Sequence, residues 1–174
     1  MNARTPISIE QVATAARKVH AMSMAEKVAL TEEIHARQPN LLASCLVQPR
    51  LGVAIEKVEF LLNILLVCFQ AMKEAGGIWP LITEDEQERH LSRHIGAVRF
   101  SEELADPALA DAARDQYLAG HSEAPLLAFV IGECTAWLAD LARRNVESES
   151  DKFVMMAAVN LVNCIAAAER KERG

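Results

Sequence analysis

Pairs of side chains that can cap a helix recur along this chain, and they constrain its fold more than any other feature. In a capping box, a Ser or Thr accepts a hydrogen bond from the first helical turn, and an acidic or amide side chain three residues later bonds back to the cap. The sequence offers four such pairs: Ser8 with Gln11, Ser23 with Glu26, Thr83 with Glu86, and Ser148 with Asp151. Asp106-Pro107 fits a further helix start, because proline favours the first helical position. No segment shows the two-residue alternation typical of a strand, so the pattern predicts an all-α chain.

Helix ends are marked as clearly as the starts. Gly76-Gly77 and Gly120 each follow a periodic apolar segment, and glycine is the preferred residue after a last helical turn. Pro39 and Pro49 bracket a short helix. We predict eight helices, over residues 8–21, 23–37, 40–48, 51–75, 83–103, 106–119, 122–145 and 148–171. With 174 residues and 51% apolar side chains, the chain can form one multi-helix bundle, a single domain over residues 1–174.

Segment 51–75 is apolar on two faces, one including Leu65 and the other including Phe60. Its polar residues form one narrow stripe: Glu56, Glu59, Asn63, Gln70 and Glu74. This pattern predicts a central helix covered on more than one side. Segment 148–171 has a similar second apolar face. Because large exposed apolar surfaces mark interfaces, we expect a homodimer that forms through one of these two helices.

Charge and composition argue against several classes of protein. The net charge is −6 and no Lys/Arg cluster is present, so we expect no nucleic-acid partner. The apolar stretches 51–69, 126–142 and 153–168 are interrupted or too short for a membrane span, so we expect no membrane insertion. The polar start of the sequence does not resemble a signal peptide, which favours a cytoplasmic protein. Four widely spaced cysteines, Cys45, Cys68, Cys134 and Cys164, are expected to be buried reduced thiols.

His90 and His94 are the clearest candidates for a metal site, because their spacing places both rings on one side of a helix. Such a pair can bind a divalent metal ion, and Glu56 and Glu59 could supply carboxylate ligands from the central helix. The Glu-x-x-His pattern of di-iron bundles is absent, however. The alternative is that the histidines lie at the boundary of the apolar stripe and that the two carboxylates form a solvated edge. On that alternative, no cofactor is bound.

Further polar residues interrupt apolar segments and are candidates for a ligand site or an interface. Asn63 lies within the central helix, Glu133 within segment 122–145, and Asn160 and Asn163 within segment 148–171. We predict that Glu133 lies at the edge of the bundle. As a hypothesis, the last two amides hydrogen-bond across a dimer interface and fix its register. Trp79, in a connecting loop, either anchors a partner protein or closes one end of the bundle.

Three classes of function stay open on the sequence alone. The first is a non-catalytic interaction or regulatory protein that acts as a homodimer. The second is a metal-dependent bundle enzyme that uses His90 and His94 with carboxylates. The third is a bundle that binds a small apolar ligand, oriented by Asn63, Asn160 and Asn163. We expect the first, because no nucleophile is tied to a base by spacing and no glycine-rich phosphate loop is present.

Overall fold

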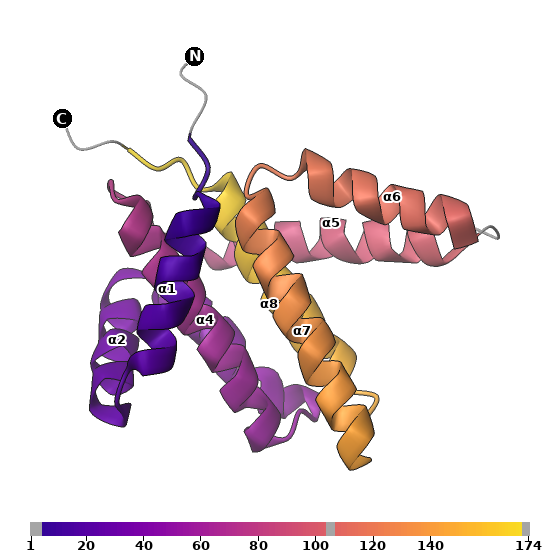
Figure 1. Ribbon diagram of the computed structural model, residues 1–174, viewed down its shortest axis with the longest axis horizontal. Coiled ribbons are helices and arrows are strands. Elements are labelled where there is room, and N and C mark those ends of the chain that lie inside the picture. Colours follow the sequence, from indigo (N-terminus) through magenta and orange to yellow (C-terminus); the bar gives the residue numbers. More distant parts are fainter. Residues whose placement is uncertain (1–4, 104–106, 172–174) are drawn as a thin grey trace.

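The computed structural model describes residues 5–103 and 107–171, and these residues form eight α-helices with no strand longer than an isolated bridge (Figure 1). The helices are α1 (Ile9–Ala21), α2 (Met24–Arg37), α3 (Pro39–Leu46), α4 (Ile55–Ala75), α5 (Glu84–Glu103), α6 (Pro107–Gly120), α7 (Ala124–Arg144) and α8 (Asp151–Ala167). The predicted all-α multi-helix bundle is therefore confirmed. A short 3-10 helix, η1 (Gln48–Leu51), joins α3 to α4, so the central helix begins four residues later than predicted.

Three of the four predicted capping boxes are confirmed. Ser8 and Ser23 each exchange two hydrogen bonds with the third residue of their helix, and Thr83 does the same with Glu86. The fourth box is only half formed. The Asp151 carboxylate accepts from the backbone N–H of Ser148, as predicted, but the Ser148 hydroxyl donates to that carboxylate rather than capping the helix, and α8 begins at Asp151 itself. The carboxylate also accepts from a lysine of α4. The proposed cap at Asp106 lies outside the described residues.

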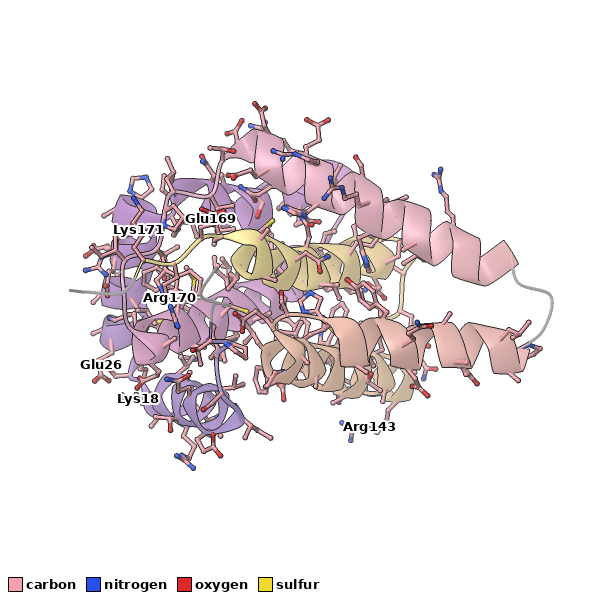
Figure 2. The ribbon with its side chains drawn as sticks, turned by 90° about the horizontal axis from the view of Figure 1, so that it is seen from above. Lys18, Glu26, Arg143, Glu169, Arg170 and Lys171 are labelled. Carbon is pink, nitrogen blue, oxygen red and sulfur yellow. The ribbon has the colours of Figure 1, made fainter. Side chains whose placement is uncertain are left out.

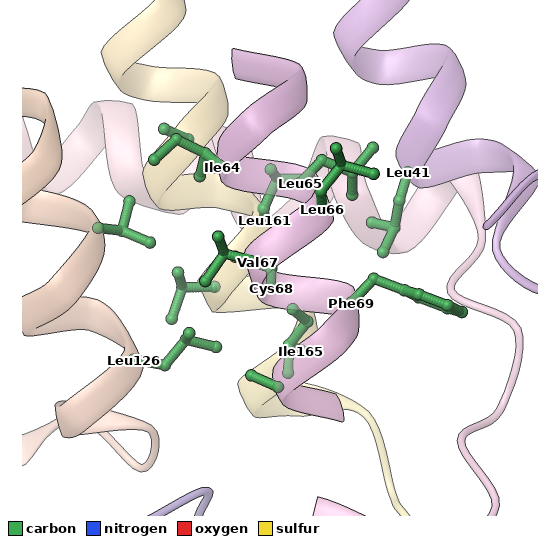
Figure 3. Close-up of a cluster of buried hydrophobic side chains, with 14 of the residues drawn as sticks. Leu41, Ile64, Leu65, Leu66, Val67, Cys68, Phe69, Leu126, Leu161 and Ile165 are labelled. Carbon is green, nitrogen blue, oxygen red and sulfur yellow. The ribbon is translucent and has the colours of Figure 1, made fainter. Parts of the chain in front are cut away.

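Helix α4 lies at the centre of the fold and is buried on opposite faces. Its neighbours are α1 on one side, α2 and α3 on another, and α8 along its length. Figure 3 shows side chains of α4, among them Leu65 and Cys68, in one cluster with Leu41 of α3, Leu126 of α7 and Ile165 of α8. The predicted central helix is thus what organises the core.

Most of the apolar surface of α4 and α8 is buried against other helices of the same chain. Helix α8 packs against α4, α5 and α7, which bury one of its apolar faces and partly cover the other, where Phe153 and Met156 are half-buried. The faces that we expected to meet a second subunit are therefore largely covered in a single copy, and homodimerisation stays a prediction. The large apolar side chains that remain exposed around η1 are Leu46, Val47, Leu51 and Ile55.

Helices α5 and α6 form a hairpin that extends beyond the rest of the molecule (Figures 1 and 2). At its base, the side chain of Asn160 in α8 donates to the backbone carbonyl of Gln87, at 3.0 Å. Beyond Gln87, no described side chain of these two helices is buried, and Leu91, Ile95 and Leu118 are half-buried. The hairpin is therefore fixed at its base and solvated along most of its length.

The C-terminal segment closes the end of α4. Ile78 and Lys171 exchange two backbone hydrogen bonds. Gly77 has a φ of 75°, and a Cβ at this position would lie 2.7 Å from the Lys171 carbonyl oxygen, so only glycine fits there. Arg170 donates to the carbonyl oxygens of Ala75 and Thr5. Figure 2 shows Arg170 and Lys171 in this segment.

Among the residues that the structure describes, one helix, α7, has the length and mean hydropathy, 1.4, of a membrane-crossing segment, and 28% of this apolar stretch is buried. One such helix is weak evidence for a membrane span, because it meets the criteria of length and composition alone. The sequence-based prediction of no membrane insertion stays a prediction.

All four cysteines are free and buried, as predicted. Burial raises the pKa of the Cys45 thiol to about 12 and that of Cys134 to about 11. Since the thiolate is the reactive form, we expect no thiol of the folded protein to react with Ellman's reagent within minutes at pH 8. All four should react at once in denaturant. Rapid modification of one thiol under native conditions would contradict this placement.

Candidate functional site

Five of the predicted site residues fall into two separate depressions. The first, here called the groove, lies between α1, α2, α4 and α7 and has a volume of about 570 Å³. Its lining residues are Ala16, Arg17, Val19, His20, Lys27, Phe60, Asn63, Ile64, Val67, Phe129 and Glu133. The second, here called the histidine pocket, lies between α5, α6 and α8 and has a volume of about 280 Å³. The groove holds the predicted Asn63 and Glu133, and the pocket holds the predicted His90, His94 and Asn163.

The floor of the groove is apolar. Val19, Ile64 and Val67 are buried there, while Phe60 and Phe129 are half-buried. The Phe60 ring stacks on Trp137 of α7, with ring centroids 4.6 Å apart and an interplanar angle of 3°. The groove therefore offers an apolar surface in which the Phe60 ring is held by stacking on a neighbouring indole.

The rim of the groove carries charge of mostly one sign. Arg17 and His20 come from the edge of α1, whose buried face begins with Val12 and packs on α4, and Lys27 comes from α2. Glu133 of α7 is the single carboxylate among the lining residues. With Arg17 and Lys27 against one Glu, the rim favours a negatively charged group.

Asn63 links the floor to the basic side of the rim. Lys27 Nζ donates to Asn63 Oδ1 at 3.2 Å, and Asn63 Nδ2 donates to the Glu59 carbonyl oxygen at 3.2 Å. The amide therefore holds the ammonium group over the groove. Asn63 and Glu133 are both exposed, so the prediction that Glu133 lies at the edge of the bundle is confirmed.

The histidine pocket places His90 and His94 on one side of α5, as their spacing predicts. It also contains two residues that the sequence reasoning missed, Tyr117 of α6 and His121 of the following turn. Tyr117 Oη donates to Asn163 Oδ1 at 2.9 Å, and His121 Nε2 donates to the same oxygen at 3.1 Å. These partners are distant in sequence, so no local pattern could have joined them.

Burial lowers the pKa of both helical histidines of the pocket. For His94 desolvation is the whole cause, and for His90 the nearby Arg93 and Arg89 add to it. Both imidazoles are therefore neutral at pH 7. Burial also raises the pKa of Tyr117, against the effect of its bond to Asn163.

The structure does not assemble the predicted metal site. Among the residues it describes, no three His, Cys, Asp or Glu side chains lie close enough together to hold a metal ion. Glu56 and Glu59 are exposed in the first turns of α4, the end that Lys57 ties to the start of α8. Asn163, beside the histidines, lies twelve residues further along α8, about 18 Å at 1.5 Å per residue. The two carboxylates thus lie at the other end of α8 and form the solvated edge that was the alternative.

Asn160 and Trp79 have structural roles. Asn160 is buried, and its Nδ2 donates to the Gln87 carbonyl oxygen, while its Oδ1 has no partner among the described residues. Asn163 Oδ1 accepts from Tyr117 and His121. The hypothesis that the two amides pair across a dimer interface stays a prediction. Trp79 Nε1 donates to the carbonyl oxygens of Met72 and Gly76 at the end of α4. With Arg170 over its ring, Trp79 lies where the alternative of closing one end of the bundle expects it, and its role as a partner anchor stays a prediction.

A buried ion pair was also missed by the sequence reasoning. Lys57 Nζ contacts Asp151 Oδ1 at 2.5 Å and donates to the Val146 carbonyl oxygen and to Ser148 Oγ. The signal was present, because Lys57 lies in helical register with the apolar Leu61 and Ile64. A lysine in a buried stripe needs a carboxylate partner.

No family model, curated protein or solved structure matches this chain. The groove and the histidine pocket are therefore the features of the molecule that bear on its function.

Proposed function

We propose that this protein is a non-catalytic binding protein whose groove takes an anionic amphiphile, a molecule with an apolar body and one negatively charged headgroup. The observation that carries the proposal is the juxtaposition of an apolar floor, from Phe60 to Phe129, with the cations Arg17 and Lys27 on its rim. The body of the ligand lies on the floor, and the headgroup meets the cations.

The size and the lining of the groove favour binding over catalysis. Small-molecule sites typically have volumes of about 300–1,000 Å³, an apolar lining and a few polar groups that fix orientation. The groove, at about 570 Å³, fits this description. Its described lining residues include no Ser, Thr or Cys, so no hydroxyl or thiol nucleophile faces a bound molecule.

Trp137 offers a direct optical test, because its indole stacks on the Phe60 ring that lines the groove. We expect decanoate to change the Trp137 emission at concentrations about tenfold lower than decanol, because only the carboxylate gains charge-assisted hydrogen bonds. Decylamine should bind more weakly still. A Trp79→Phe variant removes the second indole, so that any remaining change in emission comes from Trp137. Equal binding of decanoate and decanol would refute the role of the cations.

A second candidate is an interaction or regulatory protein that acts as a homodimer, and the exposed apolar side chains around η1 favour it: Leu46, Val47, Leu51 and Ile55. The expected cytoplasmic location rests on the polar start of the sequence alone. Native mass spectrometry of the purified protein separates the two candidates. A monomer that retains a small acid supports the groove, whereas a dimer without any retained molecule supports the interaction protein.

A further inference from the structure

The histidine pocket lies apart from the groove and shares no lining residue with it. It lies at the base of the hairpin of α5 and α6, where both helices meet the last turns of α8. A ligand of the groove would therefore not contact the side chains of the histidine pocket.

Hydrogen bonds fix the direction of the Asn163 amide. The backbone N–H of Glu123 donates to His121 Nδ1, so this nitrogen carries no proton in the neutral ring and the proton is on Nε2. His121 Nε2 and the Tyr117 hydroxyl then both donate to Asn163 Oδ1. Since this oxygen already accepts two bonds, the group left to serve the pocket is the Asn163 NH₂, a donor.

Other groups of the pocket also act as donors. His94 Nδ1 is buried and has no hydrogen-bond partner among the described residues, which leaves Nε2 as the ring atom that can serve a ligand. Arg93 adds a guanidinium from the same side of α5 as His90, and Ser122 adds a hydroxyl. None of the described lining residues is an Asp or a Glu. A site of this kind suits an acceptor with several oxygens and negative charge.

We propose that the histidine pocket binds a small oxyanion, a phosphate group that is either free or the end of a small organic molecule. Asn163 and Arg93 are its main donors, and Tyr117 and His121 are positioning residues that hold the Asn163 amide. At about 280 Å³, the pocket has room for a phosphate and a short organic group.

The test is a titration of the whole protein with inorganic phosphate and with phenyl phosphate, followed by NMR of the histidine ring protons. Sodium chloride at equal ionic strength is the blank. We expect phosphate to shift the His90 and His94 resonances in a saturable way that chloride does not reproduce. Saturation by phosphate alone indicates a free anion, and tighter binding of phenyl phosphate indicates an organic phosphate. If neither saturates, the proposal is wrong.

Two variants locate the site. Asn163→Asp keeps an oxygen for Tyr117 and His121 but replaces the donor by a charge of the wrong sign, so binding should weaken about a hundredfold. Arg93→Gln, at an exposed position that does not threaten folding, should weaken it about fivefold. The matched control is Arg99→Gln on the same helix, outside the pocket. Equal affinities of Arg93→Gln and Arg99→Gln would overturn the assignment. A groove variant, Lys27→Gln, should leave phosphate binding unchanged, so the two sites succeed or fail independently.

Discussion

Replacement of Asp151 by Ala is expected to lower the free energy of unfolding by about 3–5 kcal/mol, because it leaves the ammonium group of Lys57 buried without its counter-charge. The side chain of Asp151 is only 7% exposed and that of Lys57 only 10%. Their bonds join the start of α8 and the preceding turn to the first turn of α4. Urea denaturation of the variant measures the loss.

A double variant distinguishes charge burial from lost packing. Lys57→Met combined with Asp151→Leu removes both charges and should recover much of the lost stability, because apolar side chains of similar volume often replace a buried pair at little cost. The control is Asp140→Ala, which breaks the exposed ion pairs with Arg143 and Arg144 and should have a far smaller effect. A double variant as unstable as Asp151→Ala would contradict this explanation.

The same pair makes stability depend on pH. Burial alone would raise the pKa of Asp151, but hydrogen bonds from Lys57 and Ser148 outweigh it and hold the pKa below its ordinary value. A carboxyl with a lowered pKa contributes its stability fully above its unfolded pKa and loses it as the pH falls through the folded value. The difference in stability between wild type and Asp151→Asn should therefore shrink in acid.

Replacement of Leu65 by Ala is expected to cost about 2–5 kcal/mol, the range found when a buried leucine leaves a cavity. Leu65 is 1% exposed and lies where α4 meets its neighbours in the core (Figure 3). Denaturant titration of the free energy of unfolding measures the effect.

Ile55 is the matched control for Leu65. The helical wheel places both on one apolar face of α4, yet Ile55 is 64% exposed. Ile55→Ala should therefore change stability by less than about 0.5 kcal/mol. Similar losses in the two variants would mean that α4 is buried from its first turn, contrary to the structure.

The exposure of Ile55 could not be predicted from the sequence. The period of apolar residues predicts that α4 is central, but not where neighbouring helices stop covering it. Capping boxes at Ser8, Ser23 and Thr83 are local, so the sequence predicts them well. Ser148 and Asp151 had the same spacing, but a partner 94 residues away in sequence, Lys57, changed the outcome.

In the candidate sites too, features local to one helix were predicted, and features that depend on contacts between helices were not. The spacing of His90 and His94 predicts their common side, because four residues make about one helical turn. Tyr117 and His121 join them only through the packing of α6 and α8. The groove likewise combines Arg17 from α1 with Phe129 from α7, and no sequence pattern relates these elements. The predictions from spacing that are confirmed therefore concern residues of one helix or its cap, while sites between helices required the fold.

Isothermal titration calorimetry with decanoate tests the proposed groove most directly, using the double variant Arg17→Gln/Lys27→Gln. The control is Lys18→Gln, which removes a cation next to Arg17 that pairs with Glu74 outside the groove. We expect the double variant to bind at least about tenfold more weakly than wild type. Lys18→Gln should bind as wild type does. An equal affinity of all three proteins for decanoate, or no binding to any of them, would contradict the proposal that this groove holds an anionic amphiphile.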